Sequence, residues 1–165
     1  MFRTVADFTA RFDFESKATT RVFDALTEKS LRQAIADDHR NIGRLAWHIV
    51  TTYPEMAGQI GIPSGGVDPK APVPSLAAIR SSYAAATKAL ADAVSGWSDE
   101  DLLKVDNLYG EDWERGKTLL VLLTHEAHHR GQMTVLMRQA GLKVPGVYGP
   151  SLEEWVNYGA QPPAV

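Results

Sequence analysis

Three histidines carry the clearest potential for chemistry in this sequence. His125 and His129 lie four residues apart in LLVLLTHEAHHRGQMTVLMRQAG, where apolar residues recur at helical spacing. Because positions four apart on an α-helix lie one turn above each other, both imidazoles can face the same interior point. His48 lies in a second run of this kind, IGRLAWHIV. Facing helices of a bundle build metal sites from inward side chains, so the sequence predicts one divalent ion shared by the three histidines.

The alternative to a metal site is that these histidines are ordinary core residues. A histidine pair at this spacing is equally compatible with two hydrogen-bonded core residues, and a third ligand would decide between the two interpretations. His48 is the best candidate for that ligand. An apo bundle with three core histidines therefore stays open as a further interpretation.

Three histidine ligands would leave an open coordination position, as in catalytic zinc sites. An ion held in this way lowers the pKa of a bound water or thiol and polarises a substrate oxygen. Imidazole ligands also accept other first-row metals. Zinc and nickel are the leading candidates, and iron and manganese follow.

The same stretch contains a literal HExxH motif, which is typical of zincin metalloproteases. In that interpretation Glu126 is the general base, and Glu153 or Glu154 supplies the third ligand. Two features count against it: no convincing strand precedes the motif, and it does not continue as HxxGxxH. It would also leave His48 without a role. A His48→Ala variant therefore distinguishes the two interpretations, because a zincin site should keep its metal in that variant.

Two neighbours are candidate catalytic residues. Glu126 is about 100° from His125 around the helix, so it could border the metal or face solvent, and the surface position is favoured. Gln132 returns to nearly the same face, where it could hydrogen-bond a ligand or bound water, or pack its stem in the core. His128 is expected to be a packing or surface residue, and Arg130 to pair with an acidic group on another helix. Trp47, Tyr53 and Tyr83 could line the approach to the metal or belong to the core.

Composition narrows the function classes. The formal net charge of -3 and the mixed surface charges leave no basic stripe for nucleic acid. The absence of cysteine excludes disulfides and thiolate ligands, so a metal must be held by histidines and carboxylates. No signal-peptide core and no uncharged run of about 18 residues is present, so a cytoplasmic protein without membrane contact is expected.

Apolar periodicity and capping residues predict four main helices that would position the histidines. The predicted ranges are about Thr4 to Leu26, Asn41 to Thr52 and beyond, Ser75 to Val94, and Thr118 to Gly141. Pro54 should kink or interrupt the second helix, because proline lacks a backbone donor. Since strand signals are scarce, the prediction is an all-α bundle that forms one domain over residues 1–165.

The connections are predicted to hold smaller elements. These are short helical turns at Leu31 to Ile35 and Ser98 to Asp101, a loop at Ile62 to Pro74, and a small hairpin or ordered loop at Val105 to Gly116. The loop-rich C-terminal tail, VPGVYGPSLEEWVNYGAQPP, is expected to lie over the bundle as a lid, with a short helix from Ser151.

A histidine near position 50 in a WHI context, followed by HxxxH and RGQ on the last long helix, resembles the DinB family. These proteins, also called YfiT-like, are related to thiol-dependent S-transferases and to the mycothiol-dependent maleylpyruvate isomerase. The similarity extends from the first helix to the VPGVYGP tail. It implies an up-down four-helix bundle, a divalent metal on His48, His125 and His129, and often a homodimer.

The leading functional hypothesis is a metal-dependent enzyme in which the ion activates a thiol or water for attack on a small electrophilic substrate. Such an enzyme would be of the S-transferase or hydrolase type and could use a low-molecular-weight thiol as a cosubstrate. The alternative is a non-catalytic bundle that the metal stabilises, or that senses a ligand.

Overall fold

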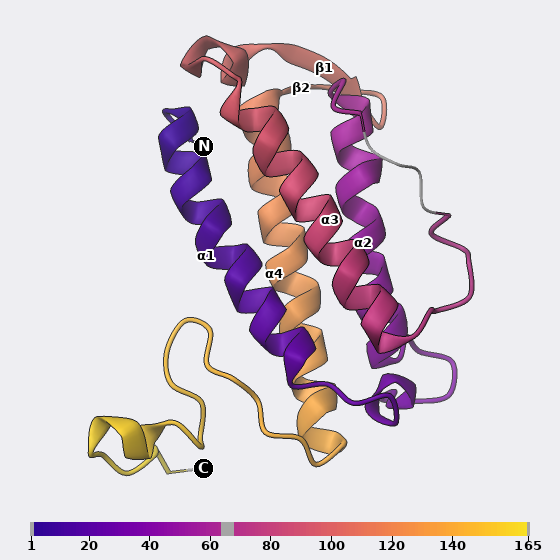
Figure 1. Ribbon diagram of the computed structural model, residues 1–165, viewed down its shortest axis with the longest axis vertical. Coiled ribbons are helices and arrows are strands. Elements are labelled where there is room, and N and C mark those ends of the chain that lie inside the picture. Colours follow the sequence, from indigo (N-terminus) through magenta and orange to yellow (C-terminus); the bar gives the residue numbers. More distant parts are fainter. Residues whose placement is uncertain (1, 64–67, 165) are drawn as a thin grey trace.

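The computed structural model describes residues 2–63 and 68–164, and most of this part of the chain is helical (Figure 1). The long helices are α1 (Val5–Asp24), α2 (Ile42–Gln59), α3 (Leu76–Ser95) and α4 (Arg115–Gln139). Short 3₁₀ helices lie at Ser30–Arg32, Asp99–Leu103 and Trp155–Tyr158. Strands β1 (Val105–Leu108) and β2 (Glu111–Glu114) pair antiparallel, with Val105 opposite Glu114. Of the hairpin and the ordered loop that the sequence allowed here, the hairpin forms. The fold is therefore mostly helical rather than strictly all-α.

Local capping chemistry explains where α1 and α3 begin. The Asp7 amide donates to Thr4 Oγ1 at 3.0 Å, and the Thr4 amide donates back to the Asp7 carboxylate at 3.2 Å. Ser75 caps α3 by accepting from the Ala78 amide at 3.3 Å. These side chains satisfy amides that have no partner within the helix. Both starts are as the sequence predicted.

Two helix features differ from the prediction. α2 continues through Pro54 as one helix to Gln59, because its apolar residues beyond the proline, Met56 and Ala57, are buried and offset the lost backbone bond. α4 begins at Arg115 rather than at Thr118, since β2 leads directly into it. Thr118 lies inside the helix, where its hydroxyl donates to the Glu114 carbonyl at 3.4 Å.

The order of the helices departs from a simple up-down bundle at one step. α2 and α3 run in the same direction, whereas the other consecutive pairs alternate (Figure 1). Arg44, near the start of α2, donates to the carbonyls of Pro69 and Ala71, close to the start of α3. The chain from residue 60 to residue 75 is long enough, at roughly 3.3 Å per extended residue, to return along the bundle. Residues 64–67 of the predicted loop lie outside the described residues.

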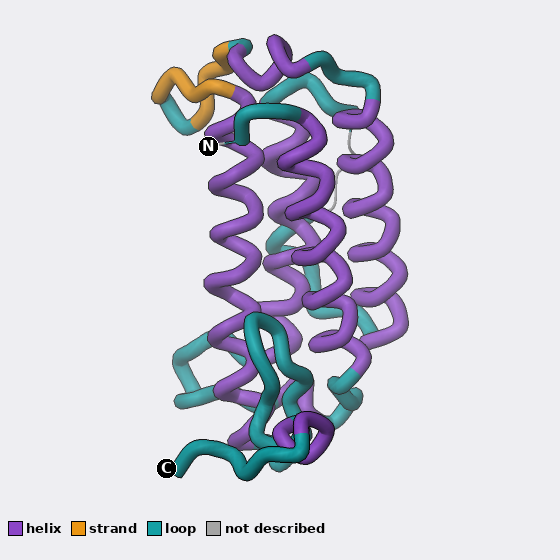
Figure 2. Tube along the Cα trace, turned by 90° about the vertical axis from the view of Figure 1, so that its left-hand side faces the viewer, coloured by secondary structure: helices purple, strands orange, loops and turns teal. Residues whose placement is uncertain are grey.

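Packing puts α2 and α4 side by side. α2 packs against α3 and α4, and α1 packs against the same two helices. The buried apolar residues of all four helices form one cluster. The β1–β2 hairpin lies at one end of the bundle and the C-terminal tail at the other (Figure 1, Figure 2). The pairing of α2 with α4 is what brings the histidines of the two helices together.

Candidate metal centre

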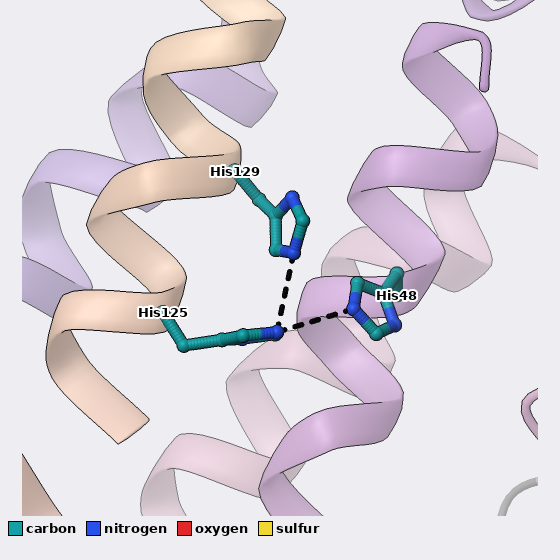
Figure 3. A group of neighbouring side chains, drawn as sticks. All are labelled: His48, His125 and His129. Atoms are coloured by element: carbon teal, nitrogen blue, oxygen red, sulfur yellow. Dashed lines mark hydrogen bonds between the residues drawn. The ribbon is translucent and has the colours of Figure 1, made fainter. Parts of the chain in front are cut away.

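The three histidines meet between α2 and α4. His48 projects from α2 toward His125 and His129, which lie one turn apart on α4 (Figure 3). His125 Nε2 lies 3.2 Å from His48 Nε2 and 3.1 Å from His129 Nε2. The ligand atoms of the three residues all lie within 4.8 Å of one another, so they could hold a metal ion.

The spacing of the nitrogens suits a metal ion. Two nitrogens bound tetrahedrally to zinc, each at about 2.0–2.1 Å, are about 3.3 Å apart. The two measured separations, 3.1 and 3.2 Å, are close to that value. An octahedral ion would bring neighbouring nitrogens slightly closer, so the spacing by itself does not select the element.

Hydrogen bonding prepares His129 for coordination through Nε2. Its Nδ1 lies 2.7 Å from Gln132 Oε1, which can only accept, so Nδ1 carries the proton and the Nε2 lone pair faces the other histidines. Gln132 therefore hydrogen-bonds a predicted ligand, as the sequence suggested. His125 Nδ1 is buried and has no hydrogen-bond partner among the described residues. In the tautomer that could bind an ion through Nε2, this Nδ1 carries the proton.

The surroundings favour neutral imidazoles. Burial, the nearby charge of Arg40 and the two other histidines lower the pKa of His48 to about 4. Burial and the neighbouring histidines, followed by Arg40, lower the pKa of His125 to about 4. The pKa of His129 is also lowered, mainly by burial. Because metals bind the neutral ring, these lowered pKa values keep the cluster ready for coordination at neutral pH.

Glu126 does not lie at the surface, so that expectation is wrong. The side chain is 1% exposed, and both oxygens accept hydrogen bonds from buried tyrosines: Tyr83 at 2.5 Å, and Tyr53 through a short contact. Burial raises the pKa of the Glu126 carboxyl. Tyr53 and Tyr83 are thus core residues that bind this carboxylate.

The zincin interpretation needs Glu126 as a free base beside the metal and Glu153 or Glu154 as a ligand. Glu126 is instead occupied in the core. Glu153 forms an ion pair with Arg138, and Glu154 accepts from the Gly146 and Ser151 amides. The residue grouped with His125 and His129 is His48. The geometry therefore favours the three-histidine site over the protease motif.

The tail docks on a different side of α4. The Tyr148 hydroxyl lies 2.7 Å from Glu15 Oε1 on α1 and 3.0 Å from Arg130 Nη2 on α4. Arg130 and Glu15 form a buried ion pair at 2.6 Å, the pairing with an acid on another helix that the sequence anticipated. The hydrogen bonds between tail and bundle run to α1 and α4, so the tail covers that pair of helices and not the gap between α2 and α4.

Sequence reasoning missed Arg40. The residue precedes α2 in an exposed connection, where no periodicity points to the histidines. The structure brings it to a cavity of about 470 Å³ that His129 and Gln132 also line. His128, in contrast, is exposed and lies outside the cluster, as expected.

Together, the bundle and the cluster define a class of protein: helical, with a candidate three-nitrogen metal site between two facing helices. Residues 1–162 match the DinB family, and the chain belongs to that family. The resemblance noted in the HHRGQ stretch is thereby confirmed.

The chain is also similar to individual proteins. The chain is 39% identical over 165 residues to the uncharacterized protein YrdA of Bacillus subtilis (strain 168), covering 99% of each. A crystal structure of a DinB-like protein from Bacillus cereus ATCC 10987 is 41% identical, with a TM-score of 0.85 over 90% of this chain and 100% of that one. YjoA, a DinB-like protein from Bacillus subtilis, shares 16% identity, with a TM-score of 0.67 over 86% and 97%, a likeness of fold alone.

Within the described ranges, no helix combines the length and the apolar character needed to cross a membrane.

Proposed function

We propose that the protein binds a divalent metal ion through Nε2 of His48, His125 and His129 and is a metal-dependent enzyme acting on a small electrophile. The observation that carries the proposal is the convergence of these nitrogens, 3.1 and 3.2 Å apart, from two facing helices. A bound ion would supply Lewis-acid chemistry, lowering the pKa of a thiol or water for attack.

The chain's own residues prepare this site in three ways. Gln132 holds the His129 ring in the tautomer that presents Nε2. Burial keeps the rings neutral. Through the cavity that His129 lines, a small molecule could approach the cluster. Since a three-residue ligand set leaves one coordination position free in a tetrahedral site, the ion could bind the nucleophile while the substrate lies beside it.

Metal binding is tested by measuring the metal content of the purified protein and its affinity for zinc and nickel, with iron and manganese compared. The His48→Ala variant should lose more affinity than the about 10–100-fold that removal of an outer-shell partner costs. His128→Ala is the matched control, because His128 is exposed on the same helix and is not in the cluster. Unchanged affinity in His48→Ala would contradict the proposed ligand set.

The reaction is tested by screening low-molecular-weight thiols and water against small electrophiles, with metal-loaded and chelated protein. Turnover should disappear with the metal and in His48→Ala, and persist in His128→Ala. Turnover that survives complete metal removal would rule out the proposed chemistry.

One observation favours a second candidate, a purely structural metal. The cluster joins α2 to α4, so an ion there would cross-link two helices. In that case chelation lowers the melting temperature, because the ion binds the native state, while no electrophile is turned over. Thermal melts beside the activity screen separate the two candidates.

A further inference from the structure

The cavity beside the histidines has the character of a small-molecule pocket. Its volume of about 470 Å³ falls in the range of about 300–1,000 Å³ that is usual for ligand sites. Its apolar walls come from three segments: Ile35 from the connection before α2, Leu45 from α2, and Val135 and Leu136 from α4. Ile35 is 62% exposed and Val135 55% exposed, so apolar surface is left open at this point. The apolar part of a ligand could cover it.

Arg40 adds a positive charge to this apolar cavity. Its guanidinium makes no hydrogen bond or ion pair with any residue that the structure describes, whereas its neighbour His39 lies 2.6 Å from the Asp38 carboxylate. Arg40 lines the same cavity as His129, one of the three clustered histidines. An uncommitted cation that lines a cavity with apolar walls suits an anion on an apolar body.

We infer that this cavity binds a small electrophilic substrate with an apolar body and one anionic group, such as a carboxylate, and that Arg40 is the anion anchor. The assignment of the bound molecule as substrate rests on the proposed function. Anion binding by Arg40 itself requires no metal, so the two proposals can fail separately.

A second cavity lacks these features. It lies between α2 and α3, has a volume of about 320 Å³, and is lined by Tyr53, Pro54, Leu90 and further neutral side chains. Among its described lining residues there is neither a charged group nor a histidine of the cluster. The coincidence of charge, apolar wall and histidine therefore distinguishes the cavity at Arg40.

The test uses 4-phenylbutanoate and its neutral counterpart 4-phenylbutanamide as probes, titrated into metal-free protein and followed by NMR. The carboxylate should bind more tightly than the amide and shift the amide signals of residues 35–45 and 129–136. Arg40→Gln should weaken carboxylate binding by about three- to fivefold, as expected for a solvent-exposed ion pair. It should leave binding of the amide unchanged.

Two further variants sharpen the result. Arg40→Lys should keep most of the preference for the carboxylate, and so should Arg32→Gln, which removes an exposed arginine that lines a different cavity. The inference is overturned if the two probes bind wild type equally, if Arg40→Gln keeps the preference, or if it weakens both probes alike.

A last experiment tests whether the carboxylate binds at Arg40 or at the metal. In zinc-loaded protein, 2-mercaptoethanol should not displace 4-phenylbutanoate; displacement would put the carboxylate on the metal instead of on Arg40 and overturn the inference. If zinc does not bind but the Arg40-dependent preference remains in the metal-free protein, the proposed function fails while the anion site stands.

Discussion

At the scale of single residues, Gln132 makes a contribution that can be isolated, because its side chain is exposed and contacts the cluster through His129. Replacing Gln132 by Ala should weaken zinc affinity about tenfold, since an outer-shell acceptor that fixes a ligand's tautomer is typically worth about 10–100-fold. The measurement is competition with a chromophoric chelator. Gln139→Ala, an exposed glutamine at the end of the same helix, is the control. Equal zinc affinity in the Gln132 and Gln139 variants would contradict this role.

Glu126 shows why the sequence could not place every residue of the HExxH stretch. Its angular separation from His125, about 100°, is a local property of the helix. Whether that direction meets solvent depends on what surrounds α4. α4 packs against both α1 and α2, so the side of α4 between these two helices faces the middle of the bundle. There Tyr53 and Tyr83 donate hydrogen bonds to the Glu126 carboxylate.

At the scale of elements, the buried Arg130–Glu15 ion pair joins α4 to α1. Thr19 Oγ1 accepts from Arg130 at 3.0 Å, which satisfies another of its donors. Replacing Arg130 by Met should destabilise the protein by about 1–3 kcal/mol, because the buried Glu15 carboxylate loses its cation on α4 and keeps only the half-exposed Arg11, 2.6 Å from Oε1. Urea denaturation measures the free energy of unfolding.

Arg138→Met is the matched control for this substitution. Arg138 lies on the same helix, but the side chain in its ion pair with Glu153 is 39% exposed. An exposed pair of this kind is typically worth about 0–1 kcal/mol. Comparable losses in the two variants would mean that burial of the Arg130 pair does not determine its contribution.

At the scale of the whole molecule, the histidine cluster should make the stability of the metal-free protein depend on pH. The pKa values of His48 and His125 are about 4 in the folded protein, against 6.5 for an unperturbed histidine. Between these values the unfolded chain binds protons that the folded protein excludes, so protonation favours unfolding. The contribution is therefore fully present above pH 6.5 and is lost as the pH falls toward 4.

Urea denaturation of metal-free protein at pH 7, 6 and 5 checks this dependence. The free energy of unfolding should fall with pH more steeply in wild type than in a variant with both His48→Gln and His125→Gln, because glutamine does not titrate. Carboxylates contribute equally to both proteins, so the comparison isolates the histidines. Parallel pH dependences would contradict the lowered pKa values.

The sequence alone determined what depends on near neighbours in the chain. Caps at Thr4 and Ser75, and the shared face of His125 and His129, follow from contacts or angles within a few residues of one helix. The tertiary structure decided the parallel course of α2 and α3, the burial of Glu126 and the approach of Arg40 to the cluster. These features depend on contacts between segments far apart in sequence, and packing chooses among arrangements that local propensity leaves equivalent.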